Sequence, residues 1–266
     1  MKANNNSSIG IFDSGVGGTS IWKEITALLP NEHTIYLADS KNAPYGQKSK
    51  EEIIDLSIKN TEFLINKNCK IIVVACNTAT TNAIQFLREH YTIPFIGIEP
   101  AIKPASLSTK KKTIGILATQ GTLNSKLFET TSSKINKEIK IIEQIGEGLV
   151  ELIENGKLKS TEMTKLLKSY INTMIEKNVD CLVLGCTHYP YLIPQIQKHV
   201  GSKIQIIDSG EAVAKQTKAI LEKNNLLKSH VKTAKKNQFY INNNKSTLEI
   251  LLSEYQENIS IAELDF

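Results

Sequence analysis

A duplicated pattern constrains the fold of this 266-residue chain more than any other feature. An apolar run that ends in a cysteine and continues into polar, threonine-containing residues occurs twice, at 71–78 and at 181–188. Each copy follows, at a similar separation, a second matching pair of runs at 9–14 and 114–119. The repetition predicts two related halves with one thiol each, and two such halves can face each other across a substrate cleft.

The order of the predicted elements indicates the fold class. Short apolar runs alternate with helical patterns, which is typical of parallel α/β sheets. We expect strands near 9–12, 34–38, 71–75, 93–98, 114–117, 139–143, 181–185, 204–207, 238–241 and 259–264. We expect helices near 19–29, 50–66, 78–90, 124–136, 146–155, 160–177, 190–199, 210–223 and 246–255. The sequence therefore predicts two similar α/β domains, each with a parallel sheet flanked by helices, and an active site in the cleft between them.

The domain boundaries follow from a break in the pattern. Residues 97–103, which include Pro100, and the nearby Pro104 indicate the crossing into the second half. We expect the tail from about Asp208 to return to the first half. The predicted first domain is therefore residues 1–98 plus 208–266, and the second is residues 99–207.

The charge pattern argues against several classes of partner. The formal net charge is +5, but the 32 basic residues include a single arginine, Arg88. Because bidentate recognition of bases and phosphates favours arginine, we expect a solvated lysine surface and no nucleic acid as primary ligand. No apolar run approaches the ~18 residues of a membrane span, and residues 1–8 lack an apolar stretch. We expect a cytoplasmic protein that does not bind a membrane.

The four cysteines do not form a disulfide framework, and they divide into two kinds. Cys69 and Cys181 start apolar runs and are predicted to be small buried hydrophobic residues. Cys76 and Cys186 lie where a strand gives way to a helix, and a helix N-terminus favours the thiolate. We expect Asn77 or Thr78 to cap the first of these helices. Cys76 and Cys186 are the candidates for chemistry.

Further polar residues follow predicted strands, and in parallel sheets such positions lie at the ligand-binding edge. They are Asp13, Ser14, Asn77, Thr78, Thr119, Thr122, Thr187 and His188. We do not expect a metal, because no fourth ligand accompanies Cys76, Cys186 and His188. A Cys–His pair within 186–188 is not favoured either, since residues two apart point in different directions in regular structure. Arg88 lies roughly 18 Å along its predicted helix from Cys76, so hydroxyls and backbone N–H groups are expected to hold any substrate carboxylate.

The glycine-rich segment at 13–18 matches neither the dinucleotide fingerprint nor the P-loop. Its glycines predict a tight turn and a close approach of the backbone to a small ligand. Asp13 at its start is either a group that orients an ammonium or assists a thiol, or a helix cap.

Four motifs together closely resemble glutamate racemase: Asp13–Gly18, Pro44–Gly46, Ala75–Ala79 and Gly185–Pro190. The resemblance implies a cofactor-independent enzyme that interconverts L- and D-glutamate, supplies D-glutamate for peptidoglycan and is commonly a homodimer. It implies that Cys76 takes the proton from D-glutamate and Cys186 takes it from L-glutamate. The further catalytic residues implied are Asp13, His188 and Glu154, and the substrate-binding residues implied are Asp13, Ser14, Pro44, Tyr45, Gly46, Asn77, Thr78, Thr119, Thr122, Thr187 and His188.

One segment departs from the family pattern. At 149–154 the sequence reads Leu-Val-Glu-Leu-Ile-Glu, in which Glu154 aligns with the functional acid and Glu151 replaces a proline. Either glutamate could therefore face the cleft. No lysine lies in an evident Schiff-base context, which agrees with the expectation that the enzyme uses no cofactor.

Three other functions are compatible with these residues. An aspartate or other amino-acid racemase of the same superfamily would also use two cysteines. A thiol hydrolase would acylate Cys186 and tolerate the loss of Cys76. A binding protein for an acidic metabolite would be stabilised by its ligand without changing it.

Overall fold

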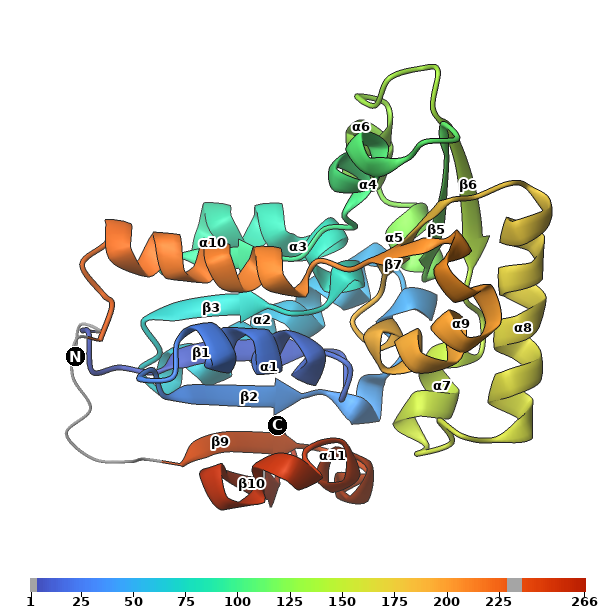
Figure 1. The fold of residues 1–266 in the computed structure, drawn as a ribbon. Helices are drawn as coiled ribbons and strands as arrows, with labels where there is room; N and C mark the ends of the chain where they lie inside the picture. Colours follow the sequence, from blue (N-terminus) through green and yellow to red (C-terminus); the bar gives the residue numbers. More distant parts are fainter. Residues whose placement is uncertain (1–3, 229–235) are drawn as a thin grey trace.

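The computed structural model describes residues 4–228 and 236–266, which form two parallel sheets flanked by helices (Figure 1). The predicted fold class is confirmed. The six-stranded sheet has the order β10-β9-β2-β1-β3-β4, with β1 (Ile9–Asp13), β2 (Thr34–Ala38), β3 (Ile71–Val74), β4 (Phe95–Gly97), β9 (Asn237–Ile241) and β10 (Ile259–Glu263). The four-stranded sheet has the order β6-β5-β7-β8, with β5 (Thr113–Ala118), β6 (Lys140–Ile145), β7 (Cys181–Gly185) and β8 (Gln205–Ile207).

The duplication in the sequence is visible in the order of the strands. The central part of the first sheet, β2-β1-β3-β4, has the same arrangement as β6-β5-β7-β8 in the second. In both, the strand that leads to a cysteine pairs with the first strand of its half, β3 with β1 and β7 with β5. The C-terminal strands β9 and β10 extend the first sheet through β2. The predicted domain limits stay a prediction, and they include residues 1–3 and 229–235, which lie outside the described residues.

Helices cover both faces of the first sheet because alternate side chains of its strands point to opposite sides. Ile9, Ile11 and Val73 pack with α1 (Thr19–Leu28) and α10 (Gly210–Lys223). Phe12, Ile72 and Val74 pack with α2 (Lys50–Asn66) and α3 (Asn77–His90). In Figure 1 this unit is on the left, and the second sheet with α8 (Thr161–Glu176) and α9 (Ile193–Val200) is on the right.

Several predicted helices differ from those in the structure. The expected helix 124–136 is the shorter α6 (Lys126–Ser132), which begins after Ser125 accepts the Phe128 N–H, and the preceding α5 (Gln120–Leu123) was not predicted. The expected helix 146–155 begins later, as α7 (Leu149–Glu154), because Gly148 adopts φ 78°. The chain between the halves contains α4 (Ile102–Ser108), where only a break was predicted.

Two further segments matter for the site. The expected helix 190–199 is a 3-10 turn at Tyr189–Leu192 followed by α9. The tail helix is α11 (Lys245–Leu251), shorter than the predicted 246–255. Residues of the tail reach α7, since Asn244 Nδ2 and Thr247 Oγ1 donate to the backbone oxygen of Glu154 at 2.5 and 3.0 Å.

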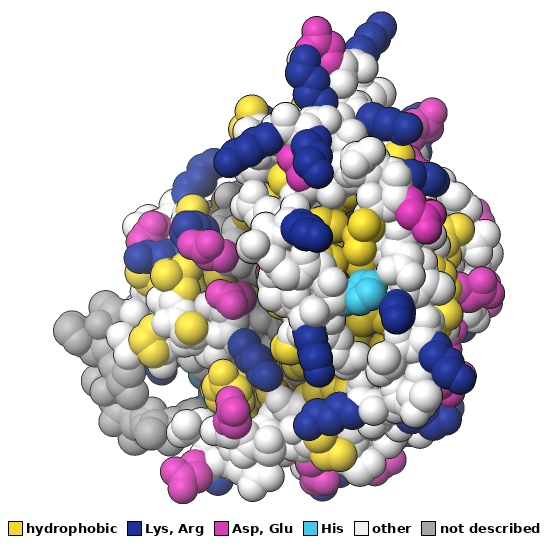
Figure 2. Space-filling model, turned by 45° about the vertical axis from the view of Figure 1, so that its right-hand side comes forward, with side chains coloured by type: hydrophobic (Ala, Val, Ile, Leu, Met, Phe, Trp, Pro, Cys, Tyr) yellow, Lys and Arg dark blue, Asp and Glu magenta, His cyan; other side chains and the backbone are white. Residues whose placement is uncertain are grey.

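The surface carries mixed charge. On the face shown in Figure 2, basic and acidic side chains are interspersed around an exposed hydrophobic area. Within the described ranges 4–228 and 236–266, no helix combines the length and the hydropathy that crossing a membrane requires.

Candidate active site

A small cavity lies beyond the carboxyl ends of the strands, where the two halves meet. Its volume is about 10 Å³. The residues that line it are Ser14, Pro44, Tyr45, Gly46, Cys76, Asn77, Thr78, Thr119, Val150, Cys186, Thr187 and His188. Both candidate thiols therefore border one cavity. The other expected site residues, Asp13, Thr122 and Glu154, contact members of this lining.

Cys76 lies at the start of α3 and is its N-cap residue. Its Sγ accepts the N–H of Ala79 at 3.4 Å and lies 3.6 Å from Ser14 Oγ. The expected cap by Asn77 or Thr78 is thus wrong, because both already lie within the helix. Burial raises the pKa of the Cys76 thiol well above its usual range, and the Asp13 charge adds to this. The hydrogen bond from Ala79 and the one that Cys76 donates to Ser14 offset only part of the rise, so the direction of the pKa shift runs against the expected ionisation of this thiol.

Cys186 follows β7 and has a different neighbour. Its Sγ lies 3.7 Å from His188 Nδ1. The prediction that these two side chains diverge is wrong, because they lie in a turn, closed by the Tyr189 N–H to the Cys186 carbonyl at 3.1 Å, and not in a helix or strand. Burial alone would lower the pKa of His188, but its hydrogen bonds to Cys186 and Glu154 outweigh burial and raise the pKa well above the usual value. The raised pKa favours the imidazolium form.

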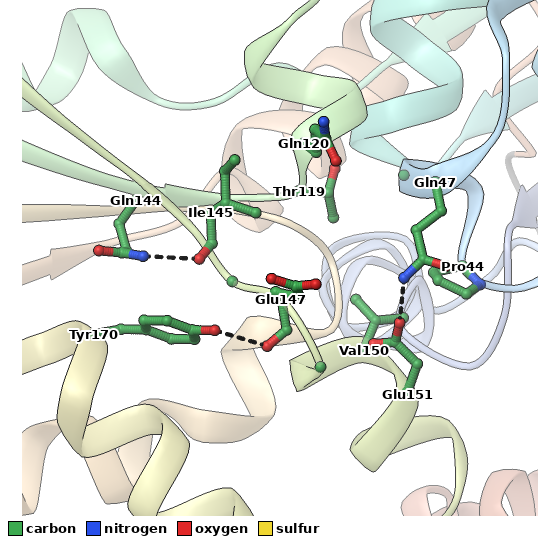
Figure 3. Close-up of a pocket in the computed structure, with 13 residues that line it drawn as sticks. Pro44, Gln47, Thr119, Gln120, Gln144, Ile145, Glu147, Val150, Glu151 and Tyr170 are labelled. Carbon is green, nitrogen blue, oxygen red and sulfur yellow. Dashed lines mark hydrogen bonds between the residues drawn. The ribbon is translucent and has the colours of Figure 1, made fainter.

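Glu154, and not Glu151, contacts the histidine. Glu154 Oε1 lies 2.5 Å from His188 Nε2 and also accepts the N–H of Val16 at 2.7 Å. Its Oε2 accepts the hydroxyl of Ser40 at 2.7 Å, and the side chain is almost completely buried. Glu151 is more exposed and accepts Gln47 Nε2 at 2.6 Å in a neighbouring cavity (Figure 3). The position of Glu154 one turn further along α7 directs it to the site.

Two glycines of the 13–18 segment are explained by these contacts. A Cβ at Gly15 would lie 2.0 Å from Glu154 Oε1, and a Cβ at Gly17 would lie 2.2 Å from His188 Nδ1. The predicted close approach of this backbone is present, but it is to the side chains of Glu154 and His188. The expected approach of this backbone to a ligand stays a prediction.

Asp13 joins the two halves from the end of β1. Its carboxylate accepts the N–H of Gly18, the N-cap residue of α1, at 2.6 Å and the hydroxyl of Thr187 at 3.4 Å. Complete burial raises the pKa of Asp13 to about 6, against the opposing effect of the nearby His188 charge. Asp13 is not the N-cap of α1, so the helix-cap alternative is wrong; it binds the N–H of the N-cap residue Gly18 and lies beside both thiol sites.

A group of hydroxyls from both halves borders the cavity. Thr78 Oγ1 lies 2.8 Å from Thr119 Oγ1, and Thr119 Oγ1 lies 3.0 Å from Thr122 Oγ1. Asn77 Oδ1 is buried and has no hydrogen-bond partner among the described residues. Tyr45 differs from these, since its hydroxyl donates to Asp39 Oδ2 at 2.5 Å. The hydroxyl group and the Asn77 oxygen provide donors and an acceptor for a charged amino acid.

Arg88 lies outside the cavity lining, and its guanidinium donates to the backbone oxygen of Phe95 at 3.2 Å. Over residues 4–228 and 236–266, no group of three or more His, Cys, Asp or Glu side chains is arranged to hold a metal ion.

Comparison with known proteins agrees with this geometry. Residues 9–217 match the sequence family described as Asp/Glu/Hydantoin racemase. The chain belongs to this racemase family. A glutamate racemase of Ralstonia pickettii is 45% identical over 207 residues, which cover 78% of this chain and 73% of that protein.

Solved structures of racemases share the whole fold. A glutamate racemase isoform of Bacillus anthracis superposes with a TM-score of 0.86 at 33% identity and covers 98% of each chain. A Francisella tularensis glutamate racemase, solved in complex with D-glutamate, superposes with a TM-score of 0.83 at 32% identity. That match covers 98% of this chain and 99% of the other.

Sequence reasoning missed three residues of this racemase's site. Val150 lines the cavity, while Asp39 and Ser40 hold Tyr45 and Glu154. Asp39 and Ser40 directly follow the predicted strand 34–38, the same signal that identified Asp13 and Cys76. Val150 carries no chemical signal, since one apolar residue in an apolar helix is indistinguishable from a core residue.

A second cavity of about 340 Å³ adjoins the first (Figure 3). The two share Pro44, Gly46, Thr119 and Val150 as a common wall. On its far side the larger cavity is bordered by Gln144, Glu147 and Tyr170, and the Tyr170 hydroxyl donates to the Glu147 backbone oxygen at 3.0 Å.

Proposed function

We propose that this protein is a glutamate racemase that interconverts L- and D-glutamate with two thiols and no cofactor. The observation that carries the proposal is the meeting of Cys76 and Cys186, from corresponding positions of two related halves, at one small cavity. Membership of the racemase family and the names of its relatives support glutamate as the substrate.

The proposed reaction removes the proton from one face of the substrate Cα and delivers a different proton to the opposite face. In the L-to-D direction, Cys186 removes the proton and Cys76 delivers another to the opposite face, and the roles reverse from D-glutamate. His188 lies 3.7 Å from the Cys186 sulfur and is paired with Glu154. It stabilises the charge that develops beside Cys186. Cys76 begins as a thiol, which suits its role as acid in this direction. Ser14 and Asp13 are the proposed partners of Cys76.

The proposed binding groups match the two kinds of charge on glutamate. The unpaired Asn77 oxygen is suited to the ammonium group. The hydroxyls of Thr78, Thr119, Thr122 and Thr187 are suited to the carboxylates, and they bond to protein groups until substrate replaces those contacts. Retaining the ammonium and excluding water both help to stabilise a carbanion-like transition state.

Substrate entry requires a conformational change. A volume of about 10 Å³ corresponds to roughly one water molecule, far less than glutamate needs. We propose that the halves separate, or that the wall formed by Pro44, Gly46, Thr119 and Val150 moves, so that the 340 Å³ cavity connects with the thiols. Closure then expels water before the proton is transferred.

The proposed biological role is the supply of D-glutamate for peptidoglycan by a cytoplasmic homodimer. Its support is the resemblance of the four motifs to glutamate racemase, and the division into domains at 1–98 plus 208–266 and 99–207 belongs to the same proposal. The two sheets and the return of β9 and β10 to the first of them support that division.

The proposal is tested by isotope labelling in deuterated water. Starting from L-glutamate, early D-glutamate should carry deuterium at Cα while recovered L-glutamate stays largely unlabelled, because the accepting thiol is not the donating one. The same pattern should hold from D-glutamate. Cys76→Ala and Cys186→Ala should each abolish racemisation in both directions. Deuterium appearing in recovered substrate as fast as in product would refute two-thiol catalysis.

The same variants separate the alternatives. Cys186, His188 and Glu154 also have the order of contacts of a thiol-hydrolase triad. A hydrolase would keep its activity in Cys76→Ala and form an acyl-enzyme on Cys186. Faster racemisation of aspartate than of glutamate would assign another substrate, and stabilisation by glutamate with no loss of optical rotation would indicate a binding protein.

A further inference from the structure

Among the described residues, Ser40 is the one side chain that donates a hydrogen bond to Oε2, the second oxygen of the Glu154 carboxylate. It begins the 3-10 turn Ser40–Asn42 directly after β2, and it is buried. Its hydroxyl donates to Glu154 Oε2 at 2.7 Å, across 114 residues of sequence. Ser40 does not line the cavity with the thiols. Its contact with the site runs through Glu154 alone.

The Glu154 carboxylate connects the two halves of the molecule. Val16 and Ser40, which donate to its two oxygens, follow β1 and β2 of the six-stranded sheet. His188, which contacts Oε1 at 2.5 Å, follows β7 of the four-stranded sheet. Since Glu154 and His188 both belong to the second half, Val16 and Ser40 are the donors that reach the carboxylate only while the halves are in contact.

We propose that Ser40 is a positioning residue, which holds the Glu154 carboxylate against His188 and thereby links contact between the halves to the imidazole beside Cys186. This inference rests on the proposed function and adds a residue to it. Ser40 neither touches the thiols nor exchanges a proton with substrate.

The physical reason is the burial of the carboxylate. A buried carboxylate that loses water needs a donor for each oxygen, and an unsatisfied charged oxygen favours the protonated form. Without Ser40, Oε2 has no other hydrogen-bond donor among the described residues. A Glu154 carboxylate that turns away from His188 would no longer help to raise the pKa of its imidazole. The other titratable groups that act on these two side chains are Asp13, Cys186 and Tyr36.

The test is the titration of His188, followed by NMR in protein labelled with ¹⁵N at histidine and assigned with His188→Gln. Ser40→Ala should lower the His188 midpoint by about one pH unit or more and lower kcat about tenfold, with a smaller change in KM. Ser40→Thr, which keeps the hydroxyl, should restore both. If Ser40→Ala does not fold, Ser40→Cys supplies a weaker donor of similar size and should give a smaller shift in the same direction.

Thr247→Val is the matched control. Thr247 donates to the backbone oxygen of Glu154 at 3.0 Å and does not contact its carboxylate. The variant should lower the melting temperature but leave the His188 midpoint unchanged. An unchanged midpoint in folded Ser40→Ala, or an equal shift in Thr247→Val, would overturn the proposal. The titration needs no activity, so failure of the wild type to racemise glutamate would refute the proposed function separately.

Discussion

The two thiols occupy equivalent places in related halves, but their surroundings differ. Cys76 is the N-cap of a regular helix and has hydroxyl and backbone N–H neighbours, Ser14 and Ala79. Cys186 is followed by a turn and has an imidazole neighbour, His188. Duplication thus supplies the geometry of two opposed groups, and local sequence supplies each with a different proton partner.

Equal amounts of L- and D-glutamate at equilibrium do not require the two thiols to have the same surroundings. Because L- and D-glutamate have equal free energy, the proposed enzyme must have equal kcat/KM in the two directions, whatever the surroundings of each thiol. Different surroundings of the two thiols can therefore make kcat and KM differ between the enantiomers, but not kcat/KM. A substitution beside one thiol should therefore change kcat and KM for each enantiomer, while kcat/KM remains equal for L- and D-glutamate.

The largest expected effect concerns Asp13, the acid that contacts both sides. Its folded-state pKa of about 6 lies above the ordinary 3.8, so its favourable contribution to folding is full below about 3.8 and is lost as the pH rises through 6. Above this window, the buried charge costs about 3 kcal/mol. Asp13→Asn should therefore be more stable than wild type at pH 8 by up to about 3 kcal/mol, yet inactive. Urea unfolding of the wild type and Asp13→Asn at pH 4 and pH 8 measures their difference in unfolding free energy. An equal difference at both pH values would contradict the raised pKa of Asp13.

A smaller effect should separate the two thiols directly. Their exposures are similar, 5% for Cys76 and 7% for Cys186, so access does not distinguish them. Because burial raises the pKa of Cys76, whereas the positively charged form favoured at His188 lies 3.7 Å from the Cys186 sulfur, iodoacetamide at pH 8 should modify Cys186 at least about tenfold faster. Peptide mass spectrometry gives both rates. Cys69, whose pKa burial raises to about 12, is the internal slow reference. Faster modification of Cys76 would reverse the comparison.

The smallest expected effect is at the single arginine. Arg88→Gln should change the KM for glutamate less than about twofold, because its guanidinium bonds to Phe95 outside the cavity. Thr187→Val should raise KM about tenfold or more, since it removes a donor proposed for a substrate carboxylate. Initial rates in both directions give these constants. The opposite order of severity would show that the hydroxyls do not bind the carboxylates.

Much of the fold could be predicted because parallel sheets have a local signature. Apolar runs followed by polar residues located the strands and placed Cys76, Asn77, Thr119 and Cys186 at one edge. The contact of Ser40 with Glu154 could not be predicted, because it joins residues that only the packing of two halves brings together. The pKa of Cys76 was mispredicted for a related reason, since sequence shows the helix N-terminus and not the burial that outweighs it.

The contact of the tail with α7 has a consequence for how the protein is made. Glu154 belongs by sequence to the second half, but its backbone oxygen is bound by Asn244 and Thr247 from the last part of the chain. During synthesis, both cysteines and their strands leave the ribosome before these two residues are added. The anchored position of α7, and with it the arrangement of Glu154 beside His188, can therefore form only after residue 247 has been added, so a nascent chain halted before residue 244 would carry both thiols without this support.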